Sequence, residues 1–232
     1  MGKHFSPRIV TEGMVLCLDA ANSESYAGSG TIWRDLSVSM TDFTLSGNPT
    51  FTLNNLGTFN FNGSTQYASI PANNNFNFTT SAIDFSIETW IYPTANGSVK
   101  AIVANWGQGG LNVSDSWLLW SNNGNLSFSW SPFSNINSLL VGSSAQLNKW
   151  THVVVTRSGN VFSMYVDGTL ATTASNSGTS NSSYSIEIGR YGSNASAYWA
   201  GNISLVRVYR NKSLTSVEVS QNFNATRGRF GI

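Results

Sequence analysis

The sequence predicts an all-β fold of two antiparallel sheets, with one short helix near its C-terminal end. Short segments of alternating apolar and polar residues recur along the chain with Gly, Asn or Pro between them, which is typical of a β-sandwich or jelly roll. Charged residues make up only 10% of the 232 residues, against about 25% in ordinary domains. Uncharged polar residues therefore form most of the surface, and they favour short strands and tight turns over long exposed helices.

The clearest strand lies at 85–93, where Phe85 and Ile91 point to one side and Glu88 to the other. A hairpin is expected at 150–168, because two alternating runs flank a Ser-Gly-Asn turn and Asp-Gly closes the second run. The other expected strands cover residues 14–20, 51–53, 58–61, 66–70, 101–107, 116–121, 125–131, 184–190 and 202–210.

One segment, 214–225, departs from the strand pattern. Thr215 is followed three residues later by Glu218, which is the spacing of a capping box at a helix N-terminus. We expect a helix of two or three turns there. No shift in composition divides the chain, so we expect an N-terminal arm at 1–13, one domain at 14–225 and a C-terminal tail at 226–232.

Composition also excludes several classes of function. The formal net charge is +1, so nothing indicates binding to nucleic acid or to an anionic membrane. No apolar run approaches the length of a membrane span. Cys17 is the only cysteine, so no internal disulfide forms. The first residues contain no apolar signal region, and we expect synthesis in a cytoplasm.

Five sequence blocks stand in order along the chain: FNGSTQYASIP, FSIETWIYP, WTHVVVTRSGNVFSMYVDG, IGR and WAGNISLVRVYRNKSLTSVEVSQNFNA. Together they resemble the laminin G-like branch of the concanavalin A-like jelly rolls, across roughly residues 14–225. The resemblance implies a two-sheet antiparallel jelly-roll sandwich with one concave sheet. It also implies that the first strand, 14–20, pairs with the last, 203–210.

Two further segments, LCLDAANSESYAGSGTIWRDLS and NFNATRGRFGI, are similar to domains of tailed-phage virion proteins. This resemblance implies a non-enzymatic structural or decoration protein, located in the virion, whose jelly roll contacts host-surface glycans. Its other partners would be virion subunits of the capsid or tail, and a homo-oligomer is left open. The terminal residues expected to dock on such partners are Phe5, Arg8, Arg227, Arg229 and Phe230. The alternatives are a stand-alone or exported lectin and, third, a polysaccharide-active enzyme.

The carboxylates argue against the enzyme. Retaining glycosidases need two carboxyl groups about 5–5.5 Å apart, yet no E-x-D-x-x-E strand occurs and no two acidic residues are spaced i, i+2. Glu88 and Glu187 remain as a candidate cross-strand pair. The alternative is that each carboxylate is a structural charge, paired with Arg207 or Arg190. We expect no catalytic residue.

Sugar binding requires exposed aromatic rings beside polar groups, and we select Trp106, Tyr191 and Tyr198 as the loop aromatics for this role. No cofactor is expected. A structural calcium ion stays open, because relatives of this fold bind calcium through loop carboxylates and carbonyls. Its candidate ligands are Asp19, Asp35 and Asp167, although Asp167 fits the Asp-Gly turn equally well.

Overall fold

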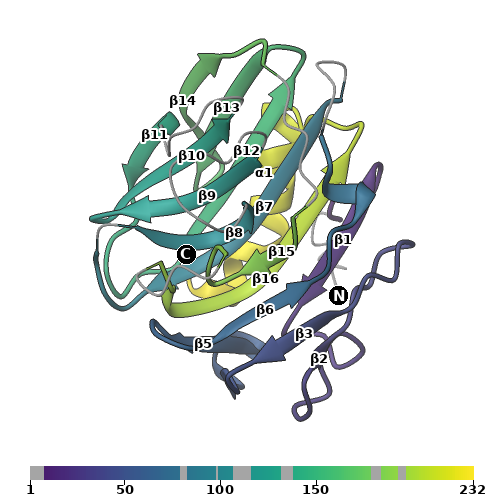
Figure 1. Cartoon of the computed structure of the whole chain (residues 1–232), viewed down its shortest axis with the longest axis vertical. Helices are drawn as coiled ribbons and strands as arrows, with labels where there is room; N and C mark the ends of the chain where they lie inside the picture. The colour runs from purple at the N-terminus through teal and green to yellow at the C-terminus, as the bar shows by residue number, and fades with distance from the viewer. Residues whose placement is uncertain are drawn as a thin grey trace, which may run out of the picture.

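The computed structural model describes residues 8–78, 83–97, 99–106, 116–131, 138–178, 184–192 and 197–232. Within these residues, two eight-stranded antiparallel sheets pack face to face as a sandwich, and one α-helix lies on the outer side of one sheet (Figure 1). The expected all-β, two-sheet class with a short C-terminal helix is therefore confirmed.

Sheet A contains the strands that carry the helix. β1 (Met14–Asp19) pairs with β16, so the expected pairing of the first and last strands is confirmed. The remaining strands of sheet A, in spatial order, are β14 (Thr169–Ser175), β13 (Val161–Val166), β12 (Thr151–Ser158), β7 (Phe85–Pro93), β16 (Ala200–Arg210), β5 (Thr58–Asn62) and β4 (Thr50–Thr52).

Sheet B forms the second layer of the sandwich. Across the two sheets, the sequence did not predict four of the observed strands: β2, β3, β11 and β14. Each expected strand has a counterpart whose ends differ by at most two residues. The strands of sheet B, in spatial order, are β11 (Ser138–Ser144), β10 (Asn125–Ser131), β9 (Ser116–Asn122), β8 (Lys100–Asn105), β15 (Ile186–Ile188), β6 (Tyr67–Ile70), β3 (Phe43–Ser46) and β2 (Ile32–Trp33).

The core between the sheets is rich in aromatic rings. Trp33, Trp117 and Trp199 are at most 1% exposed, and Phe85 stacks on Phe78 with ring centroids 4.2 Å apart. Large rings bury much apolar area each, so a chain with few charges fills this space with few residues. The described part of the chain also contains three short 3-10 turns: η1 (Asn54–Leu56), η2 (Asn74–Phe76) and η3 (Arg227–Phe230).

The helix α1 (Ser216–Thr226) covers the outer face of sheet A. The expected capping box is confirmed: the Glu218 backbone N–H donates to the Thr215 hydroxyl, and the Thr215 backbone N–H donates to Glu218 Oε2 at 2.8 Å. Residues beyond 226 continue as η3 and pack on the same face, where Phe230 stacks on Trp90 at 4.1 Å. β7 is thus buried on both faces. No described helix is long and apolar enough to cross a membrane.

Candidate functional site

The outer face of sheet B carries a row of polar side chains. Directly paired residues of antiparallel strands point to the same face, and the register pairs Thr44 with Ser69, Ser69 with Glu187 and Glu187 with Ala104. The two isoleucines that flank Glu187 in β15 are buried in the core. Glu187 therefore points outward, away from the core.

Four residues form what we call the Glu187 cluster: Glu187, Arg190, Tyr67 and Tyr198. Arg190 Nη2 and Nε donate to Glu187 Oε1 at 2.7 and 3.0 Å, and Arg190 Nη1 donates to the Tyr198 hydroxyl at 3.2 Å. The guanidinium carbon lies 3.4 Å from the centroid of the Tyr67 ring. The arginine is thus held in one orientation, while both tyrosines stay half-buried rather than fully covered.

A tight turn after β15 brings Arg190 to this position. Gly189 has φ +85°, a left-handed conformation that favours glycine, and a Cβ there would lie 3.2 Å from the ring of Phe61. The Gly189 N–H donates to the Ile102 carbonyl at 3.0 Å and fixes the turn against β8. The turn at Gly189 therefore places the Arg190 side chain against the carboxylate of Glu187, three residues earlier in the chain.

One oxygen of Glu187 is not held by Arg190. Its side chain is 3% exposed, and its Oε2 has no hydrogen-bond partner within the described residues. Burial raises the pKa of the Glu187 carboxyl, and the hydrogen bonds and charge of Arg190, together with the nearby backbone N–H of Gly192, oppose this only in part. Buried polar atoms in folded proteins nearly always have partners, so this oxygen is an acceptor without a donor among the described residues, although it is itself covered.

The three aromatic residues selected from the sequence for sugar binding lie in two different environments. Tyr198 belongs to the Glu187 cluster. Trp106 and Tyr191 are only 4% and 7% exposed, so the expectation that they offer free stacking faces is wrong. The outer face of β8 and β9 is apolar, and both rings lie in one buried cluster with Leu118 and Trp120 from that face. Any contact of theirs with a glycan stays a prediction.

Sequence reasoning missed Tyr67 as a site residue. The signal was present: Tyr67 lies within a predicted strand in which Ala68 and Ile70 face the core, so alternation directs the tyrosine outward. The sequence could not show that Tyr67 lies beside Arg190, because β6 and β15 are more than a hundred residues apart in the chain and meet only when the sheet forms.

The three calcium candidates have other roles. Both oxygens of Asp35 accept hydrogen bonds, from three backbone N–H groups and one hydroxyl. Asp19 pairs with Arg229 at 2.8 Å. Asp167 has φ +48° in the Asp-Gly turn, and its Oδ1 accepts the His152 N–H. Among the described residues, no group of three or more His, Cys, Asp or Glu side chains is placed to hold a metal ion.

The two candidate catalytic carboxylates lie in opposite sheets. Glu88 is in β7 of sheet A, under α1, whereas Glu187 faces outward from sheet B. Packed sheets are about 10 Å apart, and both side chains point away from the core, so the pair cannot reach the separation that glycoside hydrolysis needs. The two expected ion pairs are present: Arg207 lies 3.1 Å from Glu88 and Arg190 lies 2.7 Å from Glu187.

Glu88 is the centre of a buried polar network. Its Oε1 contacts Arg207 Nη1 at 3.1 Å and His152 Nε2 at 3.0 Å, and its Oε2 accepts from Asn222 Nδ2 at 2.8 Å. Burial alone would raise the pKa of this carboxyl, but the charge of Arg207 and the hydrogen bonds of His152 and Asn222 outweigh it and lower the pKa to about 2. Asn222 belongs to α1, so the network attaches the helix to the sheet.

The terminal residues selected for docking on partners are partly used inside the domain. The Arg229 guanidinium donates to the Asp19 carboxylate and to the buried Ser204 hydroxyl. It also donates to the backbone carbonyls of Asn55 and Gly57. Phe230 is 5% exposed against Trp90, so these two side chains are not free for a partner. Arg8 and Arg227 are exposed, and Phe5 lies outside the described residues.

The chain is similar to proteins of known fold. A family model of the concanavalin A-like lectin/glucanases superfamily matches residues 62–220. Among solved structures, the binding domain of Paraclostridial Mosquitocidal Protein 1 superposes with a TM-score of 0.72 at 18% identity, over 92% of this chain and 52% of that chain. No match was found among curated protein sequences.

Two other solved structures carry sugars in their descriptions. Domain 4 of AbnA, a GH43 extracellular arabinanase from Geobacillus stearothermophilus in complex with arabinotriose, has a TM-score of 0.68 at 14% identity, over 92% of this chain and 99% of that chain. The binding domain of Botulinum Neurotoxin DC in complex with SialylT has a TM-score of 0.69 at 17% identity, over 93% and 52%. The chain thus spans about half the length of the two toxin domains. At these identities the likeness establishes the fold.

Proposed function

Because this chain belongs to the concanavalin A-like lectin/glucanases superfamily, we propose that it is a non-enzymatic carbohydrate-binding domain whose site is the Glu187 cluster. The observation that carries the proposal is the buried, unpartnered Oε2 of Glu187 beside two half-buried tyrosines. A sugar offers hydroxyl donors for such an oxygen and apolar C–H faces for such rings. The arabinotriose complex of the AbnA domain supports a saccharide as the class of ligand.

The geometry of the cluster favours binding over catalysis. Arg190 already holds Oε1 with two hydrogen bonds, which leaves Oε2 as the one oxygen not held by Arg190 rather than a carboxylate free to move a proton. The only partner carboxylate that the sequence offered for Glu187, Glu88, is in the other sheet. A site that orients a sugar without a second carboxyl group performs recognition and does not cleave a glycosidic bond by the two-carboxylate route.

A glycan array tests the proposal. The wild-type chain should bind a defined set of glycans, and Glu187→Gln should lose that binding because an amide at this position no longer presents two carboxylate oxygens. Glu12→Gln is the matched control, since the Glu12 side chain is 80% exposed and far from the cluster in the chain. Absence of glycan binding by the wild type, or equal binding by both variants, would contradict the assignment.

A virion location remains a prediction, and it rests on the resemblance of the two terminal segments. Host-surface glycans would then be the ligands of the Glu187 cluster, and neighbouring subunits would contact other faces. Exposed apolar side chains on loops, such as Val38 at 91% and Leu53 at 78%, are consistent with contacts to another subunit. Detection of the chain in purified virus particles tests the virion location. Size-exclusion chromatography of the isolated protein tests whether it forms a homo-oligomer.

A further inference from the structure

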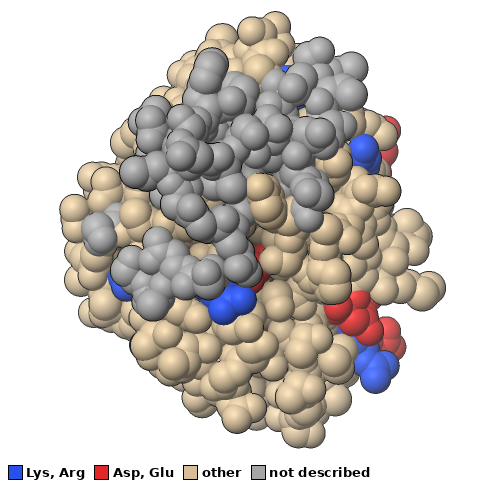
Figure 2. Space-filling view, in the orientation of Figure 1, with Lys and Arg blue, Asp and Glu red and all other residues tan. Residues whose placement is uncertain are grey.

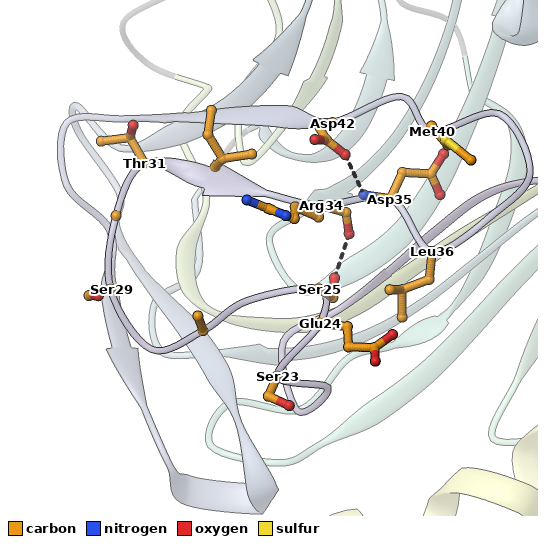
Figure 3. Close-up of a pocket in the computed structure, with 13 residues that line it drawn as sticks. Ser23, Glu24, Ser25, Ser29, Thr31, Arg34, Asp35, Leu36, Met40 and Asp42 are labelled. Atoms are coloured by element: carbon orange, nitrogen blue, oxygen red, sulfur yellow. Dashed lines mark hydrogen bonds between the residues drawn. The ribbon is translucent and has the colours of Figure 1, made fainter.

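A hollow of about 720 Å³ lies at the β2 edge of sheet B, which is within the size range of small-molecule sites, about 300–1,000 Å³. One wall is the loop before β2, from Ser23 to Thr31, and the other is formed by β2 and the segment from Arg34 to Asp42 (Figure 3). The hollow is outside the Glu187 cluster.

Hydrogen bonds hold the two walls in place. The Ser25 hydroxyl donates to the Arg34 carbonyl at 2.6 Å, and the Arg34 N–H donates to the Ser25 carbonyl at 2.8 Å. The Asp35 N–H donates to Asp42 Oδ1 at 3.0 Å (Figure 3). Asp35, saturated by its own four donors, fixes the following loop. The hollow is therefore formed before any ligand enters, which lowers the entropic cost of binding.

The side chains that line the hollow supply three kinds of contact. The exposed side chains of Arg34 and Glu24 make no hydrogen bond or ion pair within the described part of the chain, and Figure 3 shows Arg34 extending between the two walls. They provide a donor and an acceptor, and Asp42 adds a second acceptor. Ile32 and Met40, 42% and 79% exposed, add apolar surface. Hydrogen-bond donors and acceptors beside apolar carbon are the contacts by which proteins recognise sugar hydroxyls.

The register connects this hollow to the Glu187 cluster. Ile32 pairs with Thr44, Thr44 with Ser69, and Ser69 with Glu187. All four side chains face the outer side of sheet B, because directly paired residues share a face. Neighbouring strands are about 4.8 Å apart, so three steps give about 14 Å between Ile32 and Glu187. In Figure 2, charged atoms form small separate groups with uncharged surface between them, one group lying at the lower right.

We propose that the hollow is a second subsite for the same glycan, so that the ligand is a neutral oligosaccharide lying along this row from Glu187 to Arg34. This inference rests on the proposed function. The chain must be long enough to span about 14 Å, and Thr44 and Ser69 offer hydroxyl groups between the two ends. The terminal sugar must be uncharged, because Glu24, Asp35 and Asp42 outnumber Arg34 and would repel a carboxylate or sulfate.

Titration calorimetry with neutral oligosaccharide ladders, prepared from arabinan, xylan, glucan and galactan, tests the proposal. For the ladder that binds, affinity should rise about tenfold or more from the disaccharide to the tetrasaccharide or longer. Arg34→Ala should remove this gain and leave the affinity for the disaccharide unchanged, whereas Glu187→Gln should weaken every length. The same long chain with a terminal uronate should bind more weakly than the neutral one.

The outcomes separate the two claims. Binding that depends on Glu187 but not on chain length or Arg34 would overturn the second subsite and leave the proposed function intact. Tighter binding of the uronate-terminated chain would overturn the neutral ligand class. No binding by any ladder, with the array also negative, would overturn the proposed function and this inference together. Arg8→Ala serves as the control, because Arg8 is an exposed arginine before β1 whose carbonyl contacts Gln221 of α1, on the other side of the sandwich.

Discussion

Glu88 and Arg207 lie opposite each other on β7 and β16, and the Arg207 guanidinium approaches the Glu88 carboxylate to 3.1 Å beneath α1. Neither side chain is more than 3% exposed. Through Asn222, which contacts the same carboxylate at 2.8 Å, the pair joins the sheet to the C-terminal helix. A carboxylate with these partners stabilises the fold and is inaccessible to a substrate.

Glu88→Gln should lower the free energy of unfolding by about 3 kcal/mol, because removal of one partner leaves the buried Arg207 charge uncompensated. Denaturant unfolding measures the change. Glu12→Gln removes a carboxylate from an ion pair at the surface and should change stability by less than about 1 kcal/mol. Equal losses for the two variants would contradict the structural role of Glu88.

The stabilisation from Glu88 should depend on pH. Its pKa is about 2 in the folded chain, against 4.5 for the ordinary carboxyl group, so the unfolded chain binds the proton more readily. The contribution, about 3 kcal/mol, is therefore fully present above pH 4.5 and is lost as the pH falls towards 2. Unfolding curves of the wild type and Glu88→Gln should converge over that range, and a constant difference between them would argue against the lowered pKa.

Trp106→Ala should act on stability before it acts on binding. Trp106 is buried with Leu118 and Trp120 on the outer face of β8 and β9, and removal of such a ring destabilises a protein by about 3–5 kcal/mol. Thermal unfolding checks this against Leu53→Ala, whose side chain is 78% exposed. If Trp106→Ala instead retains full stability and loses glycan binding, the ring is a ligand contact.

Tyr67→Ala should weaken glycan binding about tenfold or more while changing stability by about 1 kcal/mol or less, since its ring is only half-buried and its loss removes a stacking face. Tyr67→Phe keeps the ring over Arg190 and should bind like the wild type. Calorimetry with the array-selected glycan gives both affinities. Equal affinities for the Ala and Phe variants would remove Tyr67 from the site.

Much of this fold could be predicted because its central strands alternate strongly. In the strand at 85–93, Phe85, Ile87 and Ile91 alternate with Ser86 and Glu88, and the hairpin at 150–168 has two largely apolar runs around a Ser-Gly-Asn turn. β11 and β14 escaped prediction because they lack this signal: their residues are mostly Ser, Thr and Gly or exposed. An edge strand that packs little apolar surface leaves no periodic pattern in the sequence.

The site was harder to predict than the fold. Arg190 as the partner of Glu187 could be proposed from their spacing of three residues. The assignment of Glu88 and Glu187 to opposite sheets, and the approach of Tyr67 to Arg190, depend on strand order and register that local patterns do not contain. The burial of Trp106 has a similar origin, because an apolar outer face on β8 and β9 becomes visible only once the sheet is assembled.

The most direct test of the central claim is a crystal structure of the chain with the glycan that its array selects. The account predicts a sugar hydroxyl within hydrogen-bond distance of Glu187 Oε2 and a sugar ring against Tyr67 or Tyr198. A sugar bound elsewhere, for example on sheet A beside α1, with the Glu187 cluster vacant, would contradict it.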